Sequence, residues 1–338
     1  MASIRREPLD VAAAWKRADV ESAGDWIHAL TAEEVAELDT ALAHAKRTGK
    51  ALRELTREDF SLRRLATATD RWLRDLDEGR GFLLVRGVPV HRYTDEEAAL
   101  VYWGLGLHLG TAVSQNAAGD VLGHVRDVGA DRGAEKVRLY KTRDQLGFHT
   151  DGADIIGLLC LRPAKAGGVS RIVSSVTIYN EVLRRRPDLI PVLYEPFPFD
   201  RNDEQPPGEP PFFMLPLCWF EGGRLRTFYI GWYIRDSQRH SDAPRLTPAQ
   251  IEVIDLIDMI AADPALHLDM DFLQGDIQLL KNAVTLHART EFEDFDEPAR
   301  KRHLLRLWLT ARTPFRDGDD FLRGGIPHKE GALSDTTN

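Results

Sequence analysis

The chain has 338 residues, 43% of them hydrophobic, and a formal net charge of −9. This composition can bury a full core, which excludes a disordered chain, and the interspersed charges form no basic face for nucleic acid. The two cysteines, Cys160 and Cys218, each lie in an apolar run. Two thiols are too few for a disulfide framework and fit a reducing compartment.

The N-terminal segment reaches acidic residues before any apolar stretch, and no run approaches the ~18 apolar residues of a membrane span. We therefore expect a cytoplasmic protein that has neither a membrane nor a nucleic acid as its partner.

The first 80 residues are predicted to be helical. One helix begins at the capping box formed by Thr31 and Glu34, and a second runs from about Arg57 to Leu76 with apolar residues at helical spacing. A third follows the capping box of Thr94 and Glu97 and is expected to end in the glycines at 104, 106 and 110.

A sheet is predicted to begin after Gly81, because Phe82–Val85 is a short apolar run between glycines. Further short strands are expected at 122–128, 136–140, 155–161, 170–174, 226–230, 276–280, 283–288 and 303–310. Many short strands with few helices between them favour a barrel or a sandwich over βαβ winding. Helices at 176–185 and 248–262 would lie on the outside of the sheets.

The segment 195–211 holds six prolines and five acidic residues. We expect a long surface loop there, either a plain connector or a lid or subunit contact. The predicted organisation is a helical region at 1–80, a β domain at 81–323 that contains this insert loop, and a flexible tail at 324–338.

A candidate metal site begins in the segment 147–152, where His149 and Asp151 are two positions apart. On an extended segment they project to the same side, and His287, in a strand-like run, is a candidate third ligand. Two histidines and one carboxylate leave open positions on an octahedral Fe(II). A hydrogen-bonded pair in an ordinary turn, or a catalytic zinc site, stays open as an alternative.

A candidate anion site lies on the predicted strand 300–309, where alternation puts Arg302, Leu304, Arg306 and Trp308 on one face. A guanidinium on a core-facing strand is suited to binding a carboxylate bidentately. A salt bridge to an internal acid, or a solvated face, would explain the same pattern.

The ordered set of His149-Thr150-Asp151, the Pro163–Ser170 turn, His287 and the Arg302–Arg306 strand resembles the taurine dioxygenase (TauD/TfdA) family. The resemblance covers about 122–311. It implies a mainly β fold with flanking helices, in which the core is a double-stranded β-helix (jelly-roll, cupin-like). It also implies Fe(II), 2-oxoglutarate as cosubstrate, and O₂.

The resemblance further implies that His149, Asp151 and His287 bind the metal, while Arg302 and Ser170 hold the distal carboxylate of 2-oxoglutarate. Arg306 matches a position that reaches an anionic substrate in relatives, although a structural role is equally open. Val169 stands where the family often has an acid, but the hydroxyl of the next residue remains. Because Asp151 is present, halogenation is disfavoured.

The implied function is oxidation, foremost hydroxylation, of a C–H bond in a small organic molecule, with release of succinate and CO₂. A metal-dependent hydrolase or isomerase, and a non-catalytic 2-oxoglutarate-binding protein, are the alternatives on the same fold. The sequence leaves open the substrate, which could belong to catabolism or to natural-product tailoring, and whether the chain forms a homo-oligomer.

Overall fold

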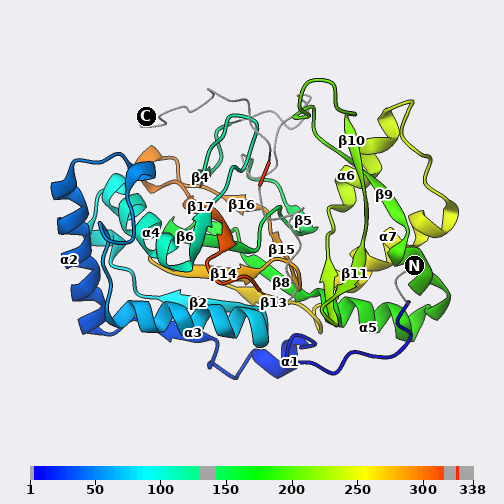
Figure 1. The fold of residues 1–338 in the computed structure, drawn as a ribbon, viewed down its shortest axis with the longest axis horizontal. Helices are drawn as coiled ribbons and strands as arrows, with labels where there is room; N and C mark the ends of the chain where they lie inside the picture. Colours follow the sequence, from blue (N-terminus) through cyan, green and yellow to red (C-terminus); the bar gives the residue numbers. More distant parts are fainter. Residues whose placement is uncertain (1–3, 130–141, 316–324, 327–338) are drawn as a thin grey trace.

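The computed structural model describes residues 4–129, 142–315 and 325–326. Two β-sheets lie face to face at the centre, with helices at both ends (Figure 1). The strand expected at 136–140 and nearly all of the expected tail lie outside the described residues.

The larger sheet has seven strands in the order β1-β2-β14-β6-β17-β3, with β4 also paired to β17. Its longest pairing, β17 with β6, is antiparallel and carries Arg306 opposite Leu158. The strands span Ile27–Ala29 (β1), Phe82–Arg86 (β2), Gly110–Ala112 (β3), Leu122–Val125 (β4), Ile155–Arg162 (β6), Ile277–Lys281 (β14) and His303–Ala311 (β17). The region predicted to be helical thus also contributes the edge strand β1.

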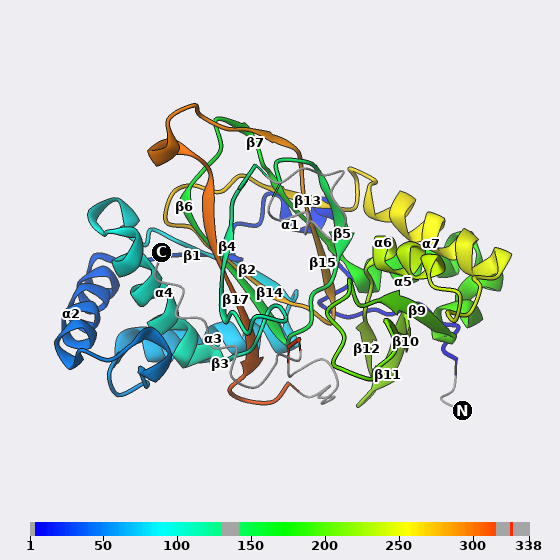
Figure 2. The ribbon, with the colours of Figure 1, turned by 90° about the horizontal axis from the view of Figure 1, so that it is seen from above.

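The smaller sheet has four strands in the order β13-β8-β15-β5. They span Leu146–His149 (β5), Ser170–Ser174 (β8), Leu268–Met270 (β13) and Thr285–Arg289 (β15). Figure 2 shows β5 and β15 on one side of the core and β6 and β17 on the other. Ile172 and Met270 of this sheet pack against Ile156 and Trp308 of the larger one. Two facing sheets built from distant strands confirm the mainly β core that was expected.

Three helices cover the outer face of the larger sheet: α2 (Ala32–Thr48), α3 (Arg64–Glu78) and α4 (Asp95–Leu109) (Figure 1). The predicted caps are confirmed, since Thr31 and Thr94 each accept a hydrogen bond from the backbone N–H three residues on. The helix expected from Arg57 begins instead at Arg64.

The glycines of α4 lie inside the helix and do not end it, contrary to the expectation for positions 104 and 106. A Cβ on Gly104 would lie 2.2 Å from the ring of Phe60. The glycine is therefore a packing requirement, and the helix ends only at Gly110.

A second group of helices lies beyond the smaller sheet: α5 (Ser175–Arg185), α6 (Gly231–Asp236) and α7 (Pro248–Ala261) (Figure 1). Together with the 3₁₀ segment Pro187–Tyr194 they enclose a second apolar core. The remaining elements are α1 (Arg17–Val20), β7 (Ala166–Gly167), β9 (Pro196–Asp200), β10 (Phe212–Pro216), β11 (Cys218–Glu221), β12 (Arg224–Thr227), β16 (Phe292–Glu293) and 3₁₀ turns at Leu52–Glu54, Val90–Arg92, Ser237–Arg239 and Pro298–Arg300.

The expectation of a loop throughout 195–211 is wrong at its start, because β9 forms an antiparallel hairpin with β10. Pro196 and Pro198 are two positions apart, so both missing N–H groups fall on the same side of the strand. A two-stranded ribbon tolerates missing N–H groups on its outer edge, because that edge pairs with no further strand. Phe197 and Phe199 are fully buried and anchor the hairpin in the second core.

Cys160 and Cys218 are both buried free thiols, as expected. Within the described ranges, none of the helices is long and apolar enough to cross a membrane.

Candidate metal centre and cosubstrate site

His149, Asp151 and His287 converge between the two sheets, and each offers one ligand atom within 4.8 Å of the others. The Nε2 atoms of His149 and His287 lie 3.8 Å and 3.6 Å from the Asp151 carboxylate. His149 ends β5 and is paired with His287 on β15, so the ladder itself brings the two imidazoles together. The convergence expected from the sequence is therefore present.

The backbone around Asp151 is fixed by side chains from other elements. The Asp151 N–H donates to Asn282 Oδ1 at 2.7 Å, and the Asn282 amide donates to the Asp151 carbonyl. The N–H of Thr150 donates to the Tyr229 carbonyl at 2.8 Å, and its hydroxyl accepts from the Tyr229 N–H. Asp151 lies two residues beyond the end of β5, so these hydrogen bonds, and not the strand pairing, orient it.

Both imidazoles are nearly free of solvent, and burial lowers the pKa of each, to about 3 for His287. The neutral form that binds metals is thus favoured. His149 Nδ1 lies 2.9 Å from the Gly147 carbonyl. A carbonyl only accepts, so Nδ1 carries the proton and Nε2 keeps its lone pair toward the site.

Burial alone would raise the pKa of Asp151, but the neighbouring Arg306 and the two histidines lower it below its usual value. Trp308 Nε1 donates to Asp151 Oδ2 at 3.0 Å, and Arg306 Nη1 lies 3.7 Å from the same oxygen. The carboxylate is thereby held as an anion from the opposite sheet.

These residues fit a divalent ion with mixed nitrogen and oxygen ligands. Ligand atoms about 2.1 Å from an ion and at right angles lie about 3 Å apart, slightly less than the separations here. Two neutral imidazoles and one carboxylate on one side of the ion are the donor set of non-haem Fe(II) oxygenases.

The predicted anion site lies at the start of β17: Arg302 directly precedes the strand and Arg306 lies within it, and they are 4% and 6% exposed. Arg306 faces the smaller sheet, since the alternate residues Leu305 and Leu307 pack against the helices. The Arg302 guanidinium lies over the ring of Phe292. Ser170 is also buried, and its hydroxyl is bonded to the Gln278 amide. Arg302 Nη1 is buried without a hydrogen-bond partner among the described residues.

Arg289, which the sequence analysis did not identify, is a further buried guanidinium, 6% exposed. It stands on β15 two residues after His287 and directly opposite Ser170 on β8. Strand alternation after His287 was a signal that could have found it. The predicted strand stopped one residue short, at position 288.

Two other side chains contact the site. Gln115 Oε1 accepts from Arg306 Nε at 2.7 Å, and the ring of Trp232 meets His149 edge-on with centroids 5.0 Å apart.

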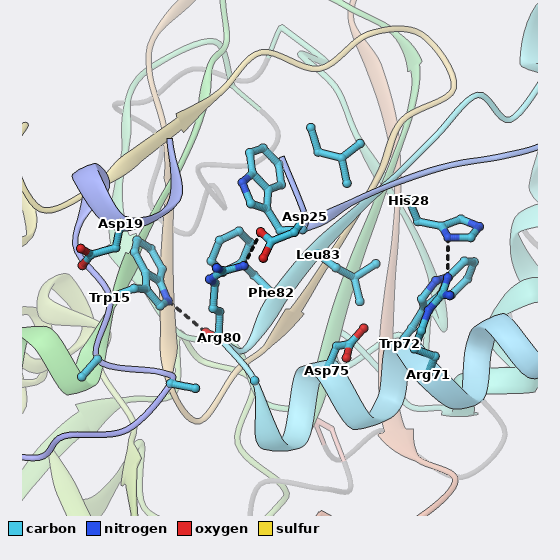
Figure 3. Close-up of a pocket in the computed structure, with 15 residues that line it drawn as sticks. Trp15, Asp19, Asp25, His28, Arg71, Trp72, Asp75, Arg80, Phe82 and Leu83 are labelled. Carbon is cyan, nitrogen blue, oxygen red and sulfur yellow. Dashed lines mark hydrogen bonds and ion pairs between the residues drawn. The ribbon is translucent and has the colours of Figure 1, made fainter. Parts of the chain in front are cut away.

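A cavity of about 800 Å³ lies elsewhere, at the β1 edge of the larger sheet between α1 and α3 (Figure 3). Its polar groups are largely paired: Arg80 with Asp25, and Arg71 with His28. None of the metal-site residues lines it, so its size alone does not make it the reaction site.

The model of the family "Taurine catabolism dioxygenase TauD, TfdA family" matches residues 47–308. FR-33289 synthase of Streptomyces rubellomurinus is 34% identical over 314 residues, covering 92% of this chain and 93% of the relative. Taurine hydroxylase-like protein SAT17 of Stachybotrys chartarum is 32% identical over 308 residues, covering 87% and 77%.

Among solved structures, asparagine oxygenase in complex with Fe(II), hydroxyasparagine and succinate is similar, with a TM-score of 0.67 and 16% identity, covering 84% of this chain and 93% of that one. The non-haem iron oxygenase OrfP in complex with Fe and alpha-ketoglutaric acid gives a TM-score of 0.62 and 16% identity, covering 89% and 100%. The fold is therefore shared with these oxygenases. The chain belongs to the TauD/TfdA family of Fe(II)- and 2-oxoglutarate-dependent dioxygenases.

Proposed function

We propose that the chain hydroxylates a small organic molecule at a site formed by His149, Asp151 and His287 as Fe(II) ligands. The observation that carries the proposal is the meeting of these three side chains, from distant parts of the sequence, in a buried space that Arg306 also reaches. Arg302 and Ser170 would hold the distal carboxylate of 2-oxoglutarate.

Each part of the chain has a separate task in this proposal. Bound Fe(II) and 2-oxoglutarate supply the oxidising chemistry, with succinate and CO₂ as co-products. The hydrogen bond to Gly147 presents the Nε2 lone pair of His149, while Trp308 and Asn282 fix the orientation of Asp151. The two facing sheets exclude water, which strengthens each charged contact.

Arg306 would face the bound anions from the opposite side. Gln115 holds its Nε, and its Nη1 lies near Asp151, so the guanidinium points at the candidate metal. Its positive charge suits a substrate or cosubstrate with an anionic group.

The relatives point to natural-product tailoring as the setting. One is named as the synthase of FR-33289 and another as a taurine hydroxylase-like protein. A small organic substrate of this kind, not a macromolecule, is the proposed partner.

The test is an anaerobic titration of the Fe(II) protein with 2-oxoglutarate, followed by visible absorption. We expect a weak charge-transfer band under anaerobic conditions and, once O₂ is admitted, formation of succinate. His149→Ala should lose both. His91→Ala, at an exposed histidine outside the site, should keep both. A zinc hydrolase would show no band, and a sensor would show the band but form no succinate with any substrate supplied.

A further inference from the structure

We propose that Arg289 is a second guanidinium for the distal carboxylate of 2-oxoglutarate, so that this carboxylate binds between Arg289 and Arg302. The inference deepens the proposed function and rests on it. Arg289 is assigned a positioning role: it would hold the cosubstrate and leave the metal to its three ligands.

The first support is that both guanidinium groups are buried with unused hydrogen-bond donors. Arg289 and Arg302 are 6% and 4% exposed. Nε and Nη1 of Arg289 and Nη1 of Arg302 have no partner among the described residues. A buried donor without a partner costs about 1–3 kcal/mol, and more when it is charged.

The second support is that no described carboxylate forms an ion pair with either group. Asp294, whose charge acts on Arg302, accepts a hydrogen bond from the backbone N–H of Arg302 and not from its side chain. Cys160 also lies near Arg302, but burial raises the pKa of its thiol to about 12, so it is neutral. Asp144 and Asp127 act on Arg289 through their charge but form no ion pair with it. Both buried cations therefore lack a directly paired carboxylate, which a bound dicarboxylate would supply.

The third support is that both groups lie around one ring. The guanidinium carbons of Arg289 and Arg302 are 4.9 Å and 5.1 Å from the centroid of Phe292. The two charges interact: after burial, the charge of Arg302 is the largest cause that lowers the pKa of Arg289, to about 10. Both remain cationic at neutral pH.

The position along the strand also fits. Arg289 is two residues from His287, which is about 7 Å along a strand, and its partner across the ladder is Ser170. A five-carbon dicarboxylate that binds the metal through its keto-acid end would extend in this direction. The keto acid would thus lie at His287 and the distal carboxylate at Arg289, Arg302 and Ser170.

Arg289 also has a structural bond that the test must separate from binding. Its Nη2 donates to the carbonyls of Thr142 and Asp144, in the segment that leads into β5. Loss of Arg289 could therefore disturb His149 through the backbone. A structural effect would weaken every 2-oxo acid alike, whereas loss of a carboxylate contact would weaken only a dicarboxylate.

The experiment compares 2-oxoglutarate with 2-oxobutyrate, a keto acid without the distal carboxylate, by anaerobic titration of the charge-transfer band of the Fe(II) protein. In Arg289→Gln we expect the Kd for 2-oxoglutarate to rise 10- to 100-fold, the range typical of a hydrogen bond to a charged group. The Kd for 2-oxobutyrate should change less than threefold. Arg302→Gln should behave in the same way.

The matched control is Arg171→Gln. Arg171 adjoins Ser170 on β8 but is paired with Asp269 and part-exposed, so neither Kd should change. Arg289→Lys keeps the positive charge but loses the planar guanidinium, and it replaces the Gln variant if that variant does not fold. It should still weaken the binding of 2-oxoglutarate more than that of 2-oxobutyrate.

Equal weakening of both keto acids in the Arg289 variants, or no weakening of either, would overturn the role of Arg289. The titration of the unsubstituted protein tests the proposed function independently of Arg289. If it gives no band with 2-oxoglutarate, the proposed function itself fails.

Discussion

At the residue scale, Trp308 connects the larger sheet to the candidate metal ligand Asp151. In Trp308→Phe the ring remains but the hydrogen bond to Oδ2 is lost. Loss of a residue that hydrogen-bonds to a metal ligand typically lowers metal affinity 10- to 100-fold. We expect Fe(II) affinity to fall about tenfold, measured by anaerobic equilibrium dialysis.

The control for this substitution is Trp103→Phe. Trp103 is buried in α4, and its Nε1 has no hydrogen-bond partner among the described residues. Its substitution should leave Fe(II) affinity unchanged. An equal loss in both variants would show that the effect comes from packing and not from the bond to Asp151.

His303 makes the stability of the fold depend on pH. Its Nδ1 accepts from Arg162 at 2.9 Å, so Nε2 carries the proton and donates to His124 at 2.8 Å. Burial, followed by the charges of His124 and Arg162, lowers the pKa of His303 to about 4. The unfolded chain, with a pKa near 6.5, takes up the proton first as the pH falls.

The folded state therefore has its full stability above about pH 6.5 and loses it toward pH 4. From pH 7.5 to 5.0 the loss from this one group is on the order of 2 kcal/mol. Urea unfolding of the metal-free protein should show a smaller drop in His303→Gln than in the unsubstituted protein. His44→Gln, at an exposed position on α2, should show the same drop as the unsubstituted protein.

Sequence reasoning at this scale found residues whose chemistry is local. The two-residue spacing of His149 and Asp151 can be read from the chain, and so can the position of Arg306 on a core-facing strand. The structure brings these three side chains together. The contacts of Asn282 and Trp308 with Asp151 depend on sheet register, which no local pattern fixes. Their roles become visible only once the strands are paired.

At the element scale, the sequence predicted helix starts best where the signal lies within four consecutive residues. Thr31 and Thr94 cap their helices as expected, because a capping box involves only four residues. The start of α3 was missed because Asp59 accepts bonds from the backbone and side chain of Thr56 and holds a turn where the apolar spacing suggested helix. Likewise, β9 was missed because its pairing with β10, twelve or more residues on, outweighs its prolines.

The turn before β14 requires a glycine at position 275. It adopts φ +85 just before β14, and a Cβ there would lie 2.0 Å from the Val88 carbonyl oxygen. The Val88 N–H also donates to the Gly275 carbonyl, so the two segments cannot separate without losing a bond. We expect Gly275→Ala to cost more than about 2 kcal/mol of unfolding free energy.

Gly24→Ala is the matched comparison for this substitution. Gly24 adopts φ +65 but has nothing within 4 Å of an added Cβ. Gly24→Ala should lower the free energy of unfolding by only about 1 kcal/mol, because only the cost of a positive φ for alanine remains. Similar losses for the two variants, measured by urea unfolding, would mean that the contact with Val88 relaxes freely.

At the scale of the whole molecule, the N-terminal arm, residues 9–15, is bonded to helix α5 at the far end of the fold. Asn180 on α5 makes two bonds to the backbone of Leu9, and the hydroxyl of Thr177 donates to the carbonyl of Trp15. α5 directly follows β8, which pairs with β15 of the metal site. The arm thus stabilises the smaller sheet from outside, over a separation of more than 160 residues that no sequence pattern reveals.

The two sheets contribute different halves of the site, and this division should appear in thermal unfolding. The candidate metal ligands come from β5, its following turn and β15, whereas Arg306 comes from β17 and Arg302 directly precedes that strand. A metal alone would bind mainly to the smaller sheet, but 2-oxoglutarate would join the two. Ligands stabilise the folded state by mass action, about 2.7 kcal/mol at 100 times Kd.

We therefore expect Mn(II), a redox-stable substitute for Fe(II), to raise the melting temperature by a few degrees, and 2-oxoglutarate to add a further rise only when Mn(II) is present. Arg302→Gln should keep the first rise and lose most of the second, because it leaves the three ligands intact. His287→Ala should lose both. The contradicting outcome is that 2-oxoglutarate stabilises His287→Ala as strongly as the unsubstituted protein. The dicarboxylate would then bind without the metal, and the prediction that it joins the two sheets through the ion would be wrong.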